Sequence, residues 1–244
     1  MPLGLAISPF TLRIVVAAAI TLFFAAGARA LRGVTRSGAL AGSLLSFLLC
    51  ISAGSGAFVL LLAVFVLSYF ATRFGRSRKE ALGTAEKREG RKASQVLANL
   101  GVGTAAAMLY ALRGHSLTFS VAMVAAFAEA ATDTVSSEVG QSVREETRLI
   151  TTWKAVPAGT DGGMTRTGTL AGCLASLLIS ALSGLTNLIP WTWVPIAVIA
   201  AVFGMLFDSL LGATIERRGV IGNDQVNLLG TLAAAILAVC VVVF

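Results

Sequence analysis

Eight long apolar stretches, separated by short segments that hold almost all of the charges, limit what this chain can fold into. The stretches lie near residues 10–31, 37–53, 56–74, 93–112, 117–139, 168–189, 192–212 and 226–244. About 20 predominantly apolar residues cross a bilayer as one helix, and only 13% of the 244 residues are charged, against about 25% in ordinary soluble proteins. The pattern predicts one all-α, polytopic integral membrane domain over residues 1–244, with about 7–8 transmembrane helices.

The basic residues indicate how the helices are oriented. All but two of the 19 Lys and Arg residues fall in the odd-numbered connecting segments, and the exceptions are Arg13 and Arg113. Segments rich in Lys and Arg face the cytoplasm, so we expect both termini outside if there are eight spans. A bacterial inner membrane with a cytoplasmic active face fits this pattern. The net charge of +7 therefore belongs to one membrane face, and nothing indicates nucleic-acid binding.

An internal repeat organises the chain. Residues 33–42 (GVTRSGALAG) and 163–172 (GMTRTGTLAG) are identical at seven of ten positions, at an offset of 130. We predict two repeats of three helices each, over 33–112 and 163–240, with a linking helix and cytoplasmic loop over 113–162. Four spans separate equivalent helices, so the two repeats are parallel across the membrane, as in some transporters.

Acidic residues inside the apolar stretches are the strongest candidates for a functional site. Glu129 and Asp133 are four residues apart and share a helix face, while Asp208 follows a long uncharged stretch. A carboxylate at the bilayer centre costs about 2.5–3.5 kcal/mol, so such residues usually line a cavity or bind something. Helix capping or snorkelling near the interface is the alternative. Mg²⁺ binds carboxylates together with waters and substrate phosphates. The predicted magnesium ligands are Asp133, Glu138, Asp208 and Glu129, and the predicted catalytic residues are Asp133, Asp208 and Arg166.

A glycine-rich segment at 157–168, PAGTDGGMTRTG, leads directly into a membrane helix. Backbone amides and the helix dipole favour phosphate at such a helix N-terminus, although a plain turn has the same composition. Amides and basic side chains that open the helices near 93 and 226 can contact a nucleotide, or equally cap or join helices. The predicted nucleotide- and phosphate-binding residues are Gly159, Thr160, Asp161, Gly162, Gly163, Thr165, Thr167, Gly168, Arg36, Arg91, Lys92, Gln95, Asn99, Asn223, Asp224 and Asn227.

Five motifs together resemble one known family. They read RKASQVLANLG at 91–101, DTVSSEVG at 133–140, RLITTWKAVPAGTDGG at 148–163, DSLLGATIERRG at 208–219 and NDQVNLLG at 223–230. In this order they resemble the transmembrane protein 19 family, which includes the plastid phytyl-phosphate kinase of tocopherol synthesis. Val135 departs from the family's usual aromatic residue after the Asp-Thr pair. The resemblance implies phosphorylation of an isoprenoid monophosphate to the diphosphate by a nucleoside triphosphate, with CTP as the expected donor.

The combined expectation is a membrane-embedded isoprenoid (prenyl or phytyl) monophosphate kinase. Phosphoryl transfer depends mostly on positioning and charge neutralisation. Mg²⁺ on the carboxylates would therefore hold the nucleotide, and Arg91 and Lys92 would neutralise the lipid phosphate. Two alternatives stay open at this point: a membrane transporter of a small or lipid anion, and a CTP-dependent lipid cytidylyltransferase. The sequence does not determine the oligomeric state.

Overall fold

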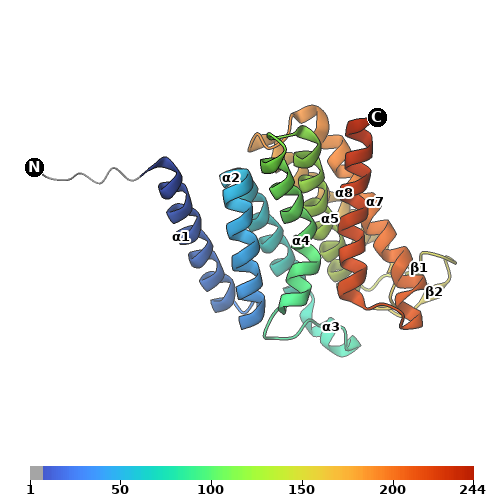
Figure 1. Ribbon diagram of the computed structural model, residues 1–244. Coiled ribbons are helices and arrows are strands. Elements are labelled where there is room, and N and C mark those ends of the chain that lie inside the picture. Colours follow the sequence, from blue (N-terminus) through green and yellow to red (C-terminus); the bar gives the residue numbers. More distant parts are fainter. Residues whose placement is uncertain (1–7) are drawn as a thin grey trace, which may run out of the picture.

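The computed structural model describes residues 8–244 as a bundle of long helices (Figure 1). The helices are α1 (Pro9–Ala30), α2 (Arg36–Arg73), α3 (Arg76–Leu82), α4 (Ala93–Leu112), α5 (Leu117–Ser142), α6 (Arg166–Leu185), α7 (Val194–Thr214) and α8 (Asn223–Val243). Three short strands lie between α5 and α6: β1 (Thr147–Leu149), β2 (Ala155–Val156) and β3 (Gly163–Met164). Six of the described helices, with α2 counted once, are long and apolar enough to cross a membrane. The prediction of a nearly all-α membrane protein is confirmed.

Helix α2 contains two of the predicted spans. Gly54 has a left-handed backbone, with φ 77°, and breaks the helix into a first arm (36–53) and a second arm (55–73). Near the end of the second arm, Tyr69 Oη and Arg73 Nη2 donate to the carbonyl of Leu31, at 3.5 and 2.9 Å. Leu31 lies in the short turn between α1 and the first arm, so both ends of α2 lie at the same end of the bundle.

Helix α5 is the centre of the bundle. It packs against α2, α4, α6, α7 and α8, and residues 120–132 are buried on every side. A helix that is apolar all round is typically an interior helix, and small residues let its neighbours approach closely. A Cβ at Gly103 of α4 would lie 2.8 Å from the Phe127 ring, and one at Gly172 of α6 would lie 2.9 Å from Ser136 Cβ. The polar C-terminal part of α5 is therefore enclosed by other helices.

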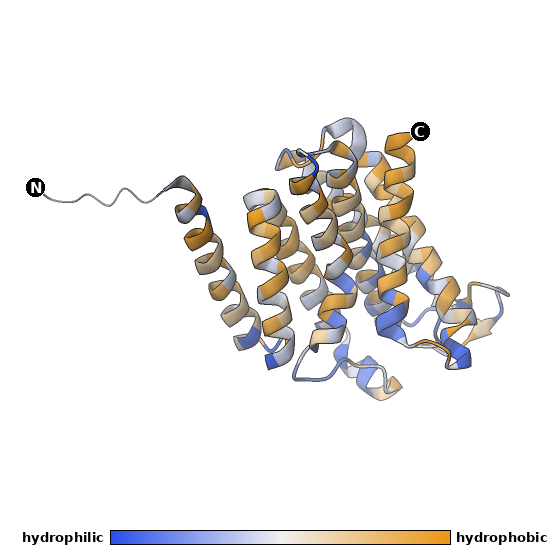
Figure 2. Ribbon diagram, viewed as in Figure 1, coloured by the Kyte–Doolittle hydropathy of each residue, from blue (hydrophilic) through white to orange (hydrophobic). Residues whose placement is uncertain are grey.

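Segments 31–35, 74–92, 143–165 and 215–222 lie together at one end of the bundle, which we call the basic end. Figure 2 shows hydrophilic residues gathered at this end and hydrophobic residues along the helices. The start of α1 and the C-terminus lie at the opposite end (Figure 1). The predicted alternation of the spans is thus present, while the cytoplasmic location of the basic end stays a prediction.

The segment between α5 and α6 differs from the expected loop. It contains a three-stranded antiparallel sheet in the order β2-β1-β3, with Arg148 opposite both Ala155 and Met164. Strands of two or three residues are too short to show an alternating pattern. The sheet holds the glycine-rich segment against the bundle.

Helices at equivalent positions of the predicted repeat begin at the predicted offset of 130. Thr35 accepts a hydrogen bond from the Gly38 amide at the start of α2, and Thr165 accepts one from the Gly168 amide at the start of α6, both at 3.1 Å. Such N-caps satisfy amides that have no partner within the helix. The duplication of 33–112 and 163–240, with its linker at 113–162, stays a prediction of the sequence.

Candidate functional site

Three neighbouring cavities at the basic end share lining residues, and we call them together the cleft. The central cavity is lined from α4, α5, α8 and the segment before α4, by Thr84, Glu86, Arg91, Gln95, Asn99, Asp133, Thr134, Ser137, Glu138, Gln141, Asn223 and Asn227. The loop cavity lies between α5, α7 and the glycine-rich segment and is lined by Asp133, Ser136, Ser137, Gly140, Gln141, Thr147, Gly159–Thr165, Asp208, Ser209, Gly212, Glu216 and Asn223. The apolar groove lies between α1, α2 and α4. Asp133 belongs to the first two cavities, and Arg91 belongs to the central cavity and the groove.

Asp133 and Asp208 meet at the loop cavity, as predicted. Neither carboxylate forms an ion pair within 4 Å in the described part of the chain, although Arg91 lies close enough to Asp133 to interact electrostatically. With the Asn227 amide oriented to satisfy its neighbours, its nitrogen donates to Asp208 Oδ2 and its oxygen accepts from Asn99 Nδ2, both at 3.3 Å. This chain of amides connects Asp208 to α4 across α8.

Glu129 lies below the cleft. Its side chain is 1% exposed, and its Oε1 has no hydrogen-bond partner in the described structure. Its side chain packs against two glycines. A Cβ at Gly204 would lie 2.6 Å from Glu129 Cγ, and a Cβ at Gly230 would lie 2.5 Å from Glu129 Oε1. Glu129 therefore lines none of the three cavities, and the structure gives it no direct access to a metal-bound nucleotide.

Glu138 has two partners within the protein. Its Oε2 lies 2.5 Å from Lys79 Nζ, and its Oε1 accepts from Thr72 Oγ1 at 2.9 Å. Both carboxylate oxygens are thus already partnered within the protein, although Glu138 lines the central cavity together with Asp133; its role as a magnesium ligand stays a prediction. Lys79 itself is fully buried.

No group of three His, Cys, Asp or Glu side chains in the described residues is arranged to hold a metal ion. Of the four predicted magnesium ligands, Asp133 and Asp208 are the two that line the loop cavity together, and the full set stays a prediction. Mg²⁺ commonly takes only one or two protein carboxylates and completes its shell with waters and substrate phosphates. A two-carboxylate donor set next to a polar cavity fits that behaviour.

The glycine-rich segment packs directly on α7. Gly162 has φ 72°, and a Cβ there would lie 2.5 Å from Ala213 Cβ and from Ser209 O. Gly159 has φ 85°. Glycine is favoured at both positions because of the left-handed backbone and because a Cβ would make a close contact, which at Gly159 is with the Thr84 side chain. The glycines thus bring Thr160 and Asp161 to the loop cavity beside Asp208.

The start of α6 is already occupied by a carboxylate of the protein. Glu145 accepts from the backbone amides of Arg166 and Thr167, at 3.2 and 2.9 Å. These hydrogen bonds, chiefly those with Thr167, lower the pKa of Glu145 below its usual 4.5. The predicted anion site at this helix N-terminus is thus filled from within, and the Arg166 side chain is exposed and lines none of the cavities.

The predicted nucleotide-binding residues divide into two groups. Those that line the cleft are Gly159, Thr160, Asp161, Gly162, Gly163, Thr165, Arg91, Gln95, Asn99, Asn223 and Asn227. Those that do not are Arg36, Lys92, Thr167, Gly168 and Asp224. Lys92 Nζ lies 3.8 Å from Asp224 on the surface, and Gly168 packs against the Ser136 carbonyl.

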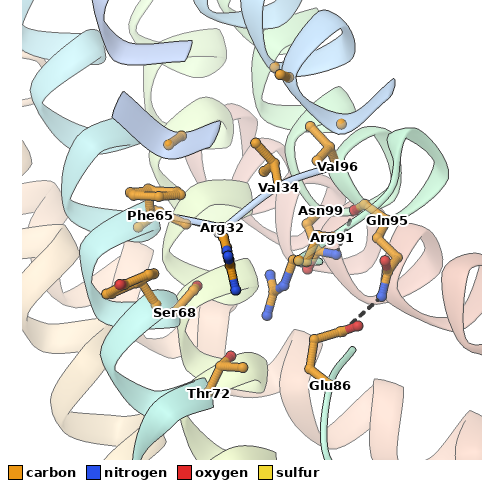
Figure 3. Close-up of a pocket in the computed structure, with 18 of the residues that line it drawn as sticks. Arg32, Val34, Phe65, Ser68, Thr72, Glu86, Arg91, Gln95, Val96 and Asn99 are labelled. Atoms are coloured by element: carbon orange, nitrogen blue, oxygen red, sulfur yellow. Dashed lines mark hydrogen bonds between the residues drawn. The ribbon is translucent and has the colours of Figure 1, made fainter. Parts of the chain in front are cut away.

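The apolar groove contains residues that the sequence analysis missed. Figure 3 shows Arg32 and Arg91 reaching into it side by side, near Glu86, whose Oε2 accepts from Gln95 Nε2 at 3.0 Å. Its apolar lining includes Phe24, Ala25, Ala28, Val34, Leu61, Val64, Phe65, Val96 and Leu100, and its basic lining is Arg32, Arg73, Arg76, Lys87, Arg88 and Arg91. The groove therefore combines an apolar channel with a cationic mouth. The concentration of basic residues in two connecting segments was the only sequence signal for this mouth.

Comparisons with known proteins agree with the motifs. A family model described as an integral membrane protein, DUF92, matches residues 19–235. Protein VTE6, chloroplastic, of Arabidopsis thaliana is 35% identical over 215 residues, which cover 85% of this chain and 65% of that protein. An uncharacterized membrane protein of Methanocaldococcus jannaschii is 34% identical over 86% of each chain. An uncharacterized membrane protein of Synechocystis is 32% identical over 75% of this chain and 72% of its own length.

No solved structure matches the chain. The family model nevertheless covers most of its length, including Arg91, Asp133, Asp208 and the glycine-rich segment. The family predicted from the motifs is confirmed. The chain belongs to the DUF92 family of integral membrane proteins.

Proposed function

We propose that this protein is an isoprenoid monophosphate kinase that transfers a phosphoryl group from a nucleoside triphosphate, CTP being the first candidate, to a prenyl or phytyl monophosphate. The observation that carries this proposal is that Arg91 and Asn99 line both the apolar groove and the polar central cavity. An amphiphile with a phosphate head can therefore present that head to a second polar site without leaving its apolar environment. The family resemblance supports the same choice.

The lipid phosphate would bind at Arg91. Guanidinium groups bind phosphate with paired, charge-assisted hydrogen bonds. The backbone of Arg91 is held firmly, because its amide donates to Gly33 O and its carbonyl accepts from the Thr35 amide, both at 3.0 Å. Its Nη2 also donates to Thr134 Oγ1 at 3.4 Å. A guanidinium held in this way contributes to rate by orienting the acceptor phosphate in advance.

The nucleotide phosphates would lie in the loop cavity. Asp133 and Asp208 are the residues that would hold Mg²⁺, which neutralises charge on the triphosphate when bound. The amides and hydroxyls of the glycine-rich segment supply neutral donors on the opposite wall. Such donors suit a nucleotide that brings its own charge and its own metal ligands.

The reaction needs little covalent chemistry from the protein. An oxygen of the lipid phosphate forms a bond to the γ-phosphorus while the bond from that phosphorus to the bridging oxygen breaks, and the nucleoside diphosphate leaves. Since the acceptor is already ionised, no strong general base is required. Arg91, between the groove and Asp133, would offset the repulsion between the two anionic reactants.

The two alternatives make different demands on the molecule. A transporter needs a path to the opposite end of the bundle, but the interior beyond the cleft is filled by fully buried side chains such as Leu60, Met123 and Phe127. A cytidylyltransferase would use the same lipid, metal and cleft. It would release pyrophosphate, whereas a kinase releases a nucleoside diphosphate.

The test is an assay of the purified protein in detergent micelles with Mg²⁺, each nucleoside triphosphate in turn and a panel of prenyl monophosphates, with products resolved by mass. We expect a prenyl diphosphate and a nucleoside diphosphate. Asp133→Asn and Asp208→Asn should each lower turnover by about 100-fold, the scale of losing one electrostatic group at a reacting centre. The control Glu146→Gln alters an exposed ion pair with Arg148 and should retain turnover. Full turnover in both Asn variants would remove the metal assignment, and pyrophosphate as the product would replace the kinase by a nucleotidyltransferase.

A further inference from the structure

We infer that two phenylalanines, Phe24 of α1 and Phe58 of α2, close the apolar groove and set the longest prenyl chain that the protein accepts. This inference rests on the proposed function and narrows its lipid substrate to short prenyl monophosphates, of farnesyl or geranylgeranyl type. Long polyprenyl monophosphates such as the undecaprenyl compound are excluded.

The groove is shorter than the membrane is thick. On α1 and the turn that follows it, the lining runs from Phe24 to Arg32, a length of at most about 12 Å at the helical rise of 1.5 Å per residue. On the second arm of α2 it runs from Leu61 to Arg73, or about 18 Å by the same rise. The hydrocarbon layer is about 30 Å thick. A prenyl chain whose phosphate lies at Arg32 and Arg91 therefore reaches the end of the groove near the middle of the bilayer.

Aromatic rings close that end. The Phe24 ring meets the Phe65 ring edge to face, with centroids 5.3 Å apart, and meets the Phe58 ring in the same way at 5.6 Å. Phe65 forms a side wall nearer the arginines, since a Cβ at Gly33, the residue after Arg32, would lie 2.8 Å from its ring. Edge-to-face pairs stabilise a fixed arrangement beyond the area they bury. The Phe24–Phe58 pair forms a floor across the groove.

A polar contact fastens α1 just beyond the floor. The buried hydroxyl groups of Thr21 and Ser46 form a hydrogen bond, with their oxygens 3.1 Å apart, and this bond connects α1 to the first arm of α2. Above the floor the walls contain small residues instead, among them Ala25, Ala28 and Gly42. The groove therefore offers its space between the arginines and the Phe24–Phe58 pair.

Phe23 provides a matched control for Phe24. It is the neighbouring residue and the same side chain, but it is 85% exposed and does not line the groove. Replacing either residue by Ala removes the same atoms from α1. Only the replacement of Phe24 opens the floor.

The test measures binding by native mass spectrometry of the purified protein, without nucleotide. The probes are farnesyl, geranylgeranyl and undecaprenyl monophosphates, with dioleoyl phosphatidic acid as a phospholipid of the same head-group charge. We expect the wild-type protein to bind the two short prenyl probes at least about tenfold more tightly than the undecaprenyl probe, the scale of discrimination by an apolar pocket. Phe24→Ala should reduce that ratio to about threefold or less, and Phe23→Ala should leave it unchanged.

A second variant tests the floor in the opposite direction. Phe24→Trp should weaken geranylgeranyl binding while farnesyl binding is retained, which a general loss of folding cannot produce. Equal binding of short and long probes by the wild-type protein, or equal effects of the Phe23 and Phe24 substitutions, would overturn the inference while leaving the proposed function intact. Preferential binding of phosphatidic acid would assign the groove to a bilayer phospholipid and overturn it as well. Failure of every prenyl probe to bind would instead contradict the proposed function.

Discussion

Lys79 and Glu138, 59 residues apart in the sequence, form an ion pair in which the Lys79 side chain is completely buried and Nζ lies 2.5 Å from Glu138 Oε2. The same nitrogen donates to the carbonyls of Ala71 and Thr72, at 3.1 and 2.7 Å. These carbonyls end α2, where a positive charge is favoured by the helix dipole. One ammonium group thus joins α2, α3 and α5 at the edge of the central cavity.

Removing one member of this pair should destabilise the protein strongly. Lys79→Met leaves Glu138 as an uncompensated, largely buried carboxylate, for which a loss of about 3–5 kcal/mol in the free energy of unfolding is expected. The double variant Lys79→Met/Glu138→Gln should recover part of the loss, because no charge is then left without a partner. Denaturant titration in mild detergent measures both. Lys154→Met, at an exposed position, serves as the control, and a Lys79→Met variant as stable as wild type would contradict the structural role of the pair.

The contact between Gly162 and α7 predicts a loss of activity on a minimal substitution. Gly162→Ala introduces a Cβ 2.5 Å from Ala213 at a left-handed residue, which adds overpacking of about 1–3 kcal/mol to the backbone strain. The glycine-rich segment should then lift from α7, and turnover should fall by about 100-fold through misplacement of the bound nucleotide. The assay described for the kinase measures it.

The control variant Gly83→Ala separates the effect of backbone strain from the effect of the steric contact with α7. Gly83 has φ 73°, and nothing lies within 4 Å of a Cβ at this position. This variant should show only the backbone cost, roughly 1–2 kcal/mol, with turnover close to wild type. Equal losses of turnover in both variants would mean that the contact with α7 is unimportant.

Close packing around Glu129 predicts opposite effects for two Gly→Ala substitutions in membrane helices. At Gly204 a Cβ would lie 2.6 Å from Glu129 Cγ and 2.8 Å from the Gly230 carbonyl, so Gly204→Ala should destabilise the protein by about 1–3 kcal/mol. At Gly101 of α4 a Cβ would meet nothing within 4 Å. Gly101→Ala should therefore be neutral or stabilise the helix by up to about 1 kcal/mol. Thermal unfolding of both variants in the same detergent tests the difference, and the reverse order would be inconsistent with the packing described.

The cap formed by Glu145 predicts a dependence of stability on pH. The pKa of Glu145 is lowered in the folded protein by hydrogen bonds from Thr167 and Arg166. Its contribution to stability is therefore fully present above the usual value of 4.5 and is lost as the pH falls through the lower value of the folded state. The difference in melting temperature between wild type and Glu145→Gln should be constant near neutral pH and shrink in acid. A difference that persists unchanged in acid would contradict the role of the carboxylate.

Several properties followed from the sequence because they depend on residues that are close together in it. Runs of about 20 apolar residues determine membrane helices whatever lies beside them, and the bias of Lys and Arg determines their alternation. Asp133 and Asp208 were predicted as site residues because a carboxylate in an apolar helix is costly wherever that helix packs, and both line the loop cavity. The family was found from five short motifs that occur in the family's order along the chain.

The tertiary structure decided which polar groups meet. Whether Glu138 faces a cavity or Lys79 depends on where α3 lies, and whether the amides of α6 bind a ligand or Glu145 depends on the turn after α5. The groove required α1 beside α2, which brought Phe24 and Phe65 together from positions 41 residues apart. The hydropathy and charge of a segment can be read from that segment alone. Which polar side chains pair depends on the distances between segments that are far apart in the sequence, and no local pattern contains those distances. For this reason the sequence determined the membrane fold and the main acidic residues, and only the folded bundle determined which of its polar groups are satisfied internally and which face the cleft.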